Sequence, residues 1–245
     1  MTQKRGVYNM ISLVIPVYNE EKIIKNTIKT IKEFMETHFN NNYQIIFVDD
    51  GSGDNTSKII SEVTEENIIL ISYEQNKGKG GAVRTGMLAA DGDVIFYTDC
   101  DLAYGLEPVR AGYDIFEKNK EADIIIASRR KHKEGYASYT LLRKILSVGF
   151  FMVLKFYGGI KQSDSQSGLK GFRNEPAKKI FNLCETNGWA FDFEALLIAD
   201  KLSYKVEEMP AKIINHNESK MSLGKDSIQM LKEIARIKKR VKNIK

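Results

Sequence analysis

The chain has few cysteines and histidines, and this shortage argues against disulfides and against zinc sites built from these residues. Its two cysteines, Cys100 and Cys184, lie far apart and in no metal-ligand spacing, which argues against a disulfide framework and favours a reducing compartment. The three histidines are scattered and form no cluster with cysteine. No Gly-x-Ser-x-Gly sequence occurs either, so zinc catalysis and serine-hydrolase chemistry have no support.

Long uncharged apolar runs are also missing. No stretch reaches the roughly 18–20 residues that a membrane-spanning helix requires, and the apolar run 11–16 is too short for a signal peptide or an anchor. The very apolar segment Leu141–Tyr157 suits either a core helix or a helix lying in the lipid headgroup layer. We therefore expect a cytoplasmic protein that is peripheral at the inner face of the membrane.

Positive charge is in mild excess and lies late in the chain. The 245 residues carry a formal net charge of +5, and the stretch Lys232–Lys245 is rich in Lys and Arg. Such a tail can bind nucleic acid, an anionic membrane or a phosphorylated substrate. No RNA-binding or helix-turn-helix signature accompanies it, so we expect no nucleic-acid partner. The length suits an N-terminal extension (1–10), one main domain (11–224) and a basic C-terminal helix (225–245).

Apolar strand-like runs alternate with segments of helical periodicity. We expect strands at 11–17, 44–48, 68–72, 93–98 and 122–128, with helices at 23–35, 56–63, 82–90 and 107–118. The second half is less regular, with helices at 139–157, 192–202 and 226–242, a strand then a helix across 172–183, and a strand at 205–214 broken by Pro210. This alternation predicts an α/β fold with a Rossmann-like, mostly parallel sheet flanked by helices.

Polar clusters follow four of the expected strands. They are Asn19-Glu20, Asp49-Asp50, Asn76-Lys77 and Asp99–Asp101. Ligands of open α/β sheets bind outside the carboxyl ends of the strands. Four clusters at one edge therefore predict a single binding site there.

The pair Asp99 and Asp101 is the strongest candidate for a metal site. In an extended backbone these two side chains point the same way, and together they can hold Mg²⁺ or Mn²⁺ while diphosphate oxygens fill the remaining positions. An isolated Asp-x-Asp is more often a solvated turn. The apolar strand before it and the companion clusters favour the metal site.

Three other clusters leave two interpretations open. Asp50 can accept a hydrogen bond from a nucleobase or sit in a turn before a helix. The glycine-rich segment 76–81, with Lys77 and Lys79, is either a phosphate cradle or a flexible surface loop. Arg129 and Arg143 either bind phosphate or are ordinary solvated charges.

These motifs, taken in order, resemble family-2 glycosyltransferases. The resemblance spans roughly residues 10–224, and its later motifs are similar to the polyprenyl-phosphate branch, in particular to dolichyl-phosphate glucosyltransferases and next to dolichyl-phosphate mannose synthases. The motifs that carry it are Val14–Glu20, Val48–Ser52, Asn76–Met87, Asp99–Asp101, Ser128-Arg129, Asp164–Lys170 and Trp189–Glu194.

The resemblance implies a GT-A fold, an inverting transfer and a role for each motif. Pro16, Tyr18, Glu20 and Asp50 would surround the nucleoside, and Asp99 and Asp101 would hold the metal and diphosphate. Arg129 and Arg143 would bind the acceptor phosphate. The sugar pocket would be formed by Asp164, Gln166, Asp192 and Glu194. A late loop with Ser219 and Lys220 would close over the diphosphate, which Lys77 and Lys79 would also contact.

The chain departs from the mannose synthases at two places, Ala103 and the segment 215–217. Both differences favour the glucosyltransferases, whereas the N-terminal anchor of their eukaryotic members is not seen. We expect transfer of a hexose, glucose, from UDP-glucose to a polyprenyl phosphate, whose dianion needs no general base. The alternatives are transfer to a hydroxyl acceptor with Asp192 as the base, mannosyl transfer from GDP-mannose, and a binding module without catalysis.

Overall fold

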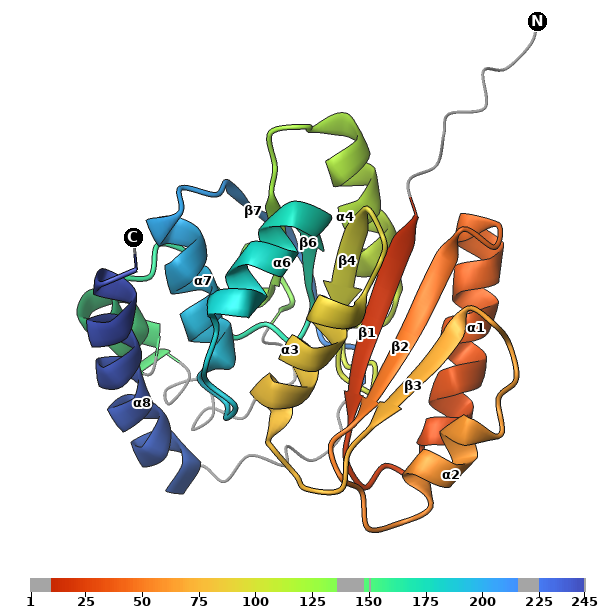
Figure 1. Ribbon diagram of the computed structural model, residues 1–245. Coiled ribbons are helices and arrows are strands. Elements are labelled where there is room, and N and C mark those ends of the chain that lie inside the picture. Colours follow the sequence, from red (N-terminus) through yellow and green to blue (C-terminus); the bar gives the residue numbers. More distant parts are fainter. Residues whose placement is uncertain (1–9, 136–147, 150, 216–224, 245) are drawn as a thin grey trace, which may run out of the picture.

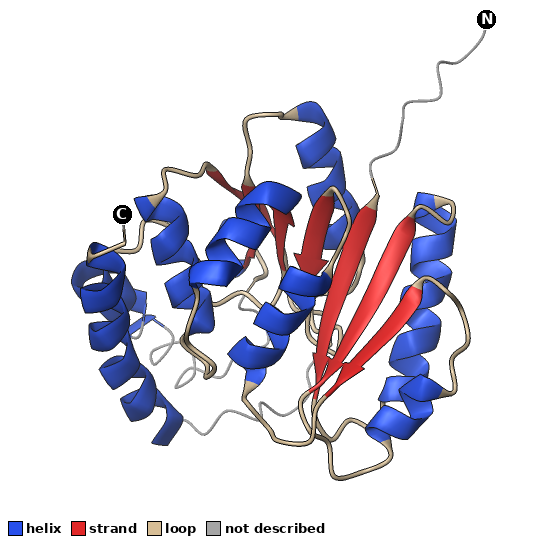
Figure 2. Ribbon diagram, in the orientation of Figure 1, coloured by secondary structure: helices blue, strands red, loops and turns tan. Residues whose placement is uncertain are grey.

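A seven-stranded sheet lies between two layers of helices in the computed structural model (Figures 1 and 2), which describes residues 10–135, 148–149, 151–215 and 225–244. The strands are β1 (Ile11–Val17), β2 (Tyr43–Asp49), β3 (Ile68–Ser72), β4 (Val94–Tyr97), β5 (Ile124–Ser128), β6 (Lys170–Arg173) and β7 (Val206–Pro210). The α-helices are α1 (Ile24–Phe39), α2 (Thr56–Ser61), α3 (Lys79–Ala89), α4 (Glu107–Lys118), α6 (Asn174–Leu183), α7 (Phe191–Lys201) and α8 (Lys225–Lys242).

The strand order is β3-β2-β1-β4-β6-β5-β7. Strands β1 to β4 pair in parallel, as do β5 and β7, so the predicted mostly parallel sheet is confirmed. The exception is β6, which runs antiparallel between β4 and β5. The loop that precedes β6 therefore reaches the same edge of the sheet as the carboxyl ends of β4 and β5.

Burial on both faces of the sheet explains the apolar character of the central strands. Every residue of β2 is buried, and only Pro16 in β1 is partly exposed. Helices α3, α6, α7 and α8 cover one face, and α1, α2 and α4 cover the other (Figure 1). In α1 the buried Ile24, Ile28, Ile31 and Met35 recur at helical spacing, which gives the apolar stripe that packs on the sheet.

The C-terminal helix belongs to the main core. Buried Met230, Ile234, Ile237 and Val241 of α8 join the same apolar cluster as α3, α6 and α7. The sequence-based division at residue 225 thus separates a helix that shares the core of the domain. Lys232, Lys238, Lys239 and Lys242 are exposed on the other side of the amphipathic helix.

The apolar segment 141–157 is described only in part, since 141–147 and 150 lie outside the described residues. Its described end is helical and continues as a π-helix, η2 (Val153–Gly158). Leu154 is buried, whereas Met152, Phe156 and Tyr157 are exposed. In the described part of the chain, no helix is both long and apolar enough to cross a bilayer.

Candidate active site

The site lies at the edge of the sheet where β1, β2 and β4 end. The loop 163–169, which leads into β6, meets this edge, and a Cβ atom added to Gly168 would lie 2.4 Å from Oδ2 of Asp99. Glycine at position 168 therefore allows the loop backbone to lie directly against the Asp99 carboxylate. The antiparallel course of β6 brings the second half of the chain to the predicted site.

The loops after β1 and β2 are joined by hydrogen bonds. The backbone N–H of Asn19 donates to Oγ of Ser52 (2.9 Å), and the side-chain oxygen of Asn19 accepts from the N–H of Gly53 (2.8 Å). The backbone N–H of Glu20 donates to Oγ1 of Thr56 (2.8 Å). Asn19 has a φ of 51° and lies outside helix α1, which begins at Ile24. The side chain of Asn19 thus binds the neighbouring loop and does not cap this helix.

Asp50 holds the glycine-rich loop in place. Its two carboxylate oxygens accept hydrogen bonds from the backbone N–H groups of Lys77 (2.8 Å) and Gly78 (2.9 Å), and the side chain is buried. The N–H groups of Gly80 and Gly81 donate to the carbonyl oxygen of Asn187. Four backbone donors of the loop thus bind protein acceptors, which disfavours a phosphate cradle made from these groups.

Lys79 brings a positive charge to the first carboxylate of the predicted metal pair. Its Nζ lies 2.5 Å from Oδ1 of Asp99 and 5.4 Å from the ring centroid of Trp189. Burial acts to lower the pKa of Lys79, but the charges of Asp99 and Asp192 outweigh it and raise this pKa above its ordinary value. Lys77, in contrast, lies over the ring of Tyr73 at 4.0 Å.

Asp101 lies in a turn and not in an extended backbone. The N–H of Leu102 donates to the carbonyl oxygen of Asp99, and Leu102 has a φ of 49°. The argument from alternating side chains therefore fails at Asp101, although the two carboxylates are close enough to interact. Burial raises the pKa of Asp101, and the negative charges of Asp99 and Glu20 raise it further. Like charges held together in this way fit a divalent cation.

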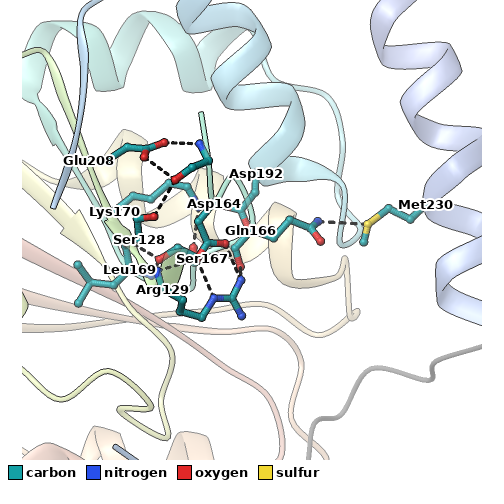
Figure 3. A network of polar contacts seen from close by, with 11 residues as sticks. Ser128, Arg129, Asp164, Gln166, Ser167, Leu169, Lys170, Asp192, Glu208 and Met230 are labelled. Carbon is teal, nitrogen blue, oxygen red and sulfur yellow. Dashed lines mark hydrogen bonds and ion pairs between the residues drawn. The ribbon is translucent and has the colours of Figure 1, made fainter. Parts of the chain in front are cut away.

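A buried ion pair links β6 to α7 (Figure 3). Nζ of Lys170 lies 2.5 Å from Oδ1 of Asp192 and donates to the carbonyl oxygen of Ser167 (2.6 Å). The hydroxyl of Tyr97 donates to the same oxygen of Asp192. Asp192, predicted in the sugar pocket, is therefore bound by two donors.

Arg129 is bound by Asp164 in a two-pronged ion pair (Figure 3). Nε of Arg129 donates to Oδ2 of Asp164 (2.7 Å) and Nη2 donates to Oδ1 (2.6 Å). Burial acts to raise the pKa of Asp164, but the charge and hydrogen bonds of Arg129 lower it below its ordinary value. The sequence assigned these residues to different ligands, the acceptor phosphate and the sugar, whereas the structure pairs them. Arg143 lies outside the described residues.

Glu194 faces α8. Its Oε1 lies 2.5 Å from Nη2 of Arg240, and its Oε2 accepts the N–H groups of Glu185 and Thr186. The carboxylate is buried and satisfied by these donors, which is a structural arrangement and differs from the predicted place in the sugar pocket. Gln166 of the β6 loop also reaches α8, where its amide lies 3.2 Å from Sδ of Met230 (Figure 3).

The sequence matches one family over most of its length. The sequence model described as "Glycosyl transferase family 2" matches residues 12–181. The chain belongs to this glycosyltransferase family. The match contains β2 to β6, all but the first residue of β1, and the loops that carry Asp50, Asp99 and Gly168.

Two relatives of known activity are similar over almost the whole chain. The dolichyl-phosphate beta-glucosyltransferase of Dictyostelium discoideum is 34% identical over 93% of this chain and 73% of its own length. The UDP-N-acetylglucosamine–dolichyl-phosphate N-acetylglucosaminyltransferase of Methanococcus voltae is also 34% identical, over 88% of this chain and 89% of its own length. Both names describe transfer to dolichyl phosphate.

Solved glycosyltransferases share the GT-A fold. The glucosyl-3-phosphoglycerate synthase of Mycobacterium tuberculosis, in complex with Mn²⁺, uridine diphosphate and phosphoglyceric acid, superposes with a TM-score of 0.62. It is 18% identical, and the match covers 94% of this chain and 78% of that one. The predicted GT-A fold is thus confirmed.

The remaining predicted residues fall into two groups. Pro16 at the end of β1, with Tyr18 and Glu20 after it, lies at the same edge as Asp50, whereas Ser219 and Lys220 lie outside the described residues. Sequence reasoning assigned no role to Tyr97, Lys170 or Trp189. Lys170 and Trp189 belong to motifs that carried the family resemblance, and this membership could have marked them as site residues. Tyr97 lies in an apolar strand, and nothing in the sequence around it indicates a role in the site.

Proposed function

We propose that this glycosyltransferase transfers a hexose, glucose, from UDP-glucose to a polyprenyl phosphate such as dolichyl phosphate, with inversion at the anomeric carbon. The observation that carries the proposal is the meeting of Asp99, Asp101 and Lys79 at the carboxyl edge of β4. Two carboxylates and one ammonium suit a metal-bound diphosphate. The dolichyl-phosphate enzymes among the relatives support the acceptor.

We assign the metal to Asp99 and Asp101. Burial, together with the neighbouring carboxylates, raises the pKa of Asp101, and the ammonium of Lys79 lies on Asp99. Both observations fit a site that favours positive charge. When bound, Mg²⁺ or Mn²⁺ supplies positive charge against the charge that grows on the diphosphate leaving group. Lys79 then has a second role open to it, since its ammonium can contact a diphosphate oxygen.

The acceptor chemistry follows from the phosphate itself. A phosphate monoester has a second pKa near 6, so at neutral pH its oxygen can attack the anomeric carbon without giving up a proton. That carbon–oxygen bond forms as the bond from the anomeric carbon to the UDP oxygen breaks, and UDP leaves. Asp192 is already bound by Lys170 and Tyr97, which makes it a weak candidate for a general base and disfavours a hydroxyl acceptor.

The test is to incubate the enzyme and Mn²⁺ or Mg²⁺ with a short polyprenyl phosphate and labelled UDP-glucose, UDP-N-acetylglucosamine or GDP-mannose. We expect a lipid-linked glucose from UDP-glucose, and none from a variant with Asp99→Asn. If no donor yields a lipid-linked sugar, the acceptor assignment is wrong.

Transfer of N-acetylglucosamine is the second candidate. It is favoured by the Methanococcus voltae relative, which is as similar to this chain as the Dictyostelium discoideum enzyme and matches over more of its own length. Competition between the two UDP-sugars in one reaction separates the candidates. A higher kcat/KM for UDP-N-acetylglucosamine would replace glucose in the proposal.

We also propose that the enzyme works as a peripheral protein at the inner membrane face, because a polyprenyl acceptor lies in a bilayer. The described end of the apolar segment presents Met152, Phe156 and Tyr157 to solvent, with Phe156 76% exposed. Lys155 beside them is exposed, and Lys238 of α8 donates to the carbonyl oxygen of Tyr157. Apolar and basic groups on one surface suit an anionic leaflet.

Vesicle flotation tests this placement. We expect the protein to float with vesicles that contain anionic lipid, and we expect Phe156→Ser to weaken this binding. Ile214→Ser is the matched control, since Ile214 is also exposed but lies against the loop at Ala103. Equal binding of wild type and Phe156→Ser, or no binding of wild type, would contradict the proposal.

A further inference from the structure

Three polar side chains from three different elements meet inside the core beside the metal residues. They are Tyr97 from β4, Lys170 from β6 and Asp192 from the first turn of α7. Tyr97 and Lys170 are fully buried, and Asp192 is 6% exposed. Both donors bind one atom, Oδ1 of Asp192. Nζ of Lys170 also lies 5.5 Å from the ring centroid of Tyr97, so the three groups form one compact cluster.

The fold does not require a charged residue at position 170. β6 pairs with β4 and β5 through its backbone, and the buried Phe172 two residues further on shows that an apolar side chain fits this strand. Removal of an ammonium from water is costly unless a counter-charge is supplied. Burial accordingly lowers the pKa of Lys170, with Asp192 acting in the opposite direction. The chain has the buried ion pair of Lys170 and Asp192 where apolar side chains could pack. This indicates that the pair serves to hold the carboxylate of Asp192 in a defined position.

The two bonds leave only one oxygen of Asp192 for a ligand. With Oδ1 bound from two directions, the carboxylate cannot rotate without breaking both bonds. No donor among the described residues bonds to Oδ2, and this atom is not among the buried polar atoms that lack a partner. Oδ2 is therefore the oxygen that remains accessible.

Asp192 is close enough to the metal residues for its charge to act there. Tyr97 precedes Asp99 by two residues along the same chain segment. The charge of Asp192 also acts on Lys79, the residue whose ammonium binds Asp99. The accessible oxygen is thus next to the place where the sugar of a metal-bound nucleotide sugar would lie.

We propose that Tyr97 and Lys170 are positioning residues that hold Asp192 so that its Oδ2 accepts a hydrogen bond from a hydroxyl of the donor sugar. This inference rests on the proposed function, because it assumes a nucleotide-sugar donor at Asp99. It assigns Tyr97 and Lys170 to recognition of the sugar and not of the nucleotide. Asp192 is then a binding group whose charge stays constant during turnover.

The test compares the binding of UDP and UDP-glucose to the full-length protein by calorimetry in Mn²⁺. The quantity of interest is the ratio of the two Kd values, because a loss of general stability alters both alike. Tyr97→Phe removes one donor and keeps the ring, and Lys170→Met removes the other. We expect UDP to bind each variant within about twofold of wild type, while UDP-glucose binds about tenfold more weakly to Lys170→Met and less so to Tyr97→Phe.

Two matched substitutions control for general effects. Tyr204→Phe removes a hydroxyl that bonds Glu175, and Lys178→Met removes an ammonium that bonds the carbonyl groups at the end of α3. Neither should alter the ratio. If Lys170→Met does not fold, Tyr97→Phe still decides the question, since its change is a single oxygen atom.

The two possible failures are distinguishable. If wild type binds UDP-glucose and forms lipid-linked sugar but both variants keep the wild-type ratio, the positioning role is wrong and the proposed function stands. If wild type itself does not bind UDP-glucose, the proposed function fails and this inference fails with it. A pH–rate profile of wild type that shows an essential base, lost in Asp192→Asn, would also overturn the inference.

Discussion

Five of the carboxylates that the sequence assigned to the site fall into two groups with different surroundings. Asp99 and Asp101 are partly exposed and lie among other carboxylates, with Lys79 as a nearby cation. Asp164, Asp192 and Glu194 are buried, and each is paired with one basic side chain, Arg129, Lys170 and Arg240 respectively. The first group lacks enough positive charge and suits an external cation. The second group is already neutralised by the chain and suits fixed geometry.

Asp99→Asn should give the largest effect, because under the proposed function it removes a charge that holds the metal and diphosphate. We expect turnover to fall by at least about 100-fold, with only a small change in melting temperature. Steady-state kinetics with UDP-glucose and thermal unfolding measure the two effects. Asp91→Asn, at an exposed residue, is the matched control, and an Asp99→Asn enzyme as active as this control would remove the contrast between the groups.

Arg240→Met should act on stability and not on catalysis. It leaves the buried carboxylate of Glu194 without its counter-ion, and we expect the free energy of unfolding to fall by about 2–3 kcal/mol. Urea denaturation measures this loss, and the exposed pair of Lys161 and Asp200 gives the control, since Lys161→Met should cost under about 0.5 kcal/mol. A loss of activity with unchanged stability would return Glu194 to the sugar pocket that the sequence predicted.

Trp189 offers a direct measure of cation binding to the first group. It is the only tryptophan of the chain, and its ring lies 5.4 Å from Nζ of Lys79, which pairs with Asp99. We expect Mn²⁺, which is paramagnetic, to quench its fluorescence, and Mg²⁺ to quench it much less. Asp99→Asn should abolish the Mn²⁺ effect. Quenching that persists in this variant would place the cation elsewhere.

The two groups should also differ in the sign of their pH dependence, which is the smallest effect. Asp101 has a raised pKa, so the folded state binds more protons than the unfolded state between 3.8 and the raised value, and its contribution to stability falls as pH rises through that interval. Asp164 has a lowered pKa, so its contribution is present above 3.8 and is lost as pH falls toward the lowered value.

Unfolding measured from pH 3 to 7 tests these signs. In wild type, Asp101 contributes to stability at low pH and this contribution is lost as pH rises. Asp101→Asn lacks the contribution at every pH, so the stability of the variant should increase relative to that of wild type as pH rises. The stability of Asp164→Asn should decrease relative to that of wild type as pH rises, because only the ionised Asp164 of wild type forms the ion pair with Arg129. The same sign for both variants would show that the two carboxylates do not differ as described.

Sequence patterns determined the local elements well. Strand β3 and helix α4 have the predicted bounds, and helices α7 and α8 begin within one residue of prediction. These elements follow from apolar periodicity, which is a local property of the chain. The gathering of polar clusters at the edge of β1, β2 and β4 was predicted for the same reason, since parallel strands that follow one another along the chain end at one edge.

Only the tertiary structure decided which charged side chains meet. Arg129 is 35 residues from Asp164, Glu194 is 46 from Arg240, and Tyr97 is 95 from Asp192. These pairings depend on the insertion of β6 between β4 and β5 and on the packing of α8 against α7, and no local pattern encodes either arrangement. The sequence therefore determined the family, the strands and the Asp99–Asp101 cluster. The sheet order decided which carboxylates have a basic partner of their own and which share Lys79, because ion pairing depends on distances in space and not on separation along the chain.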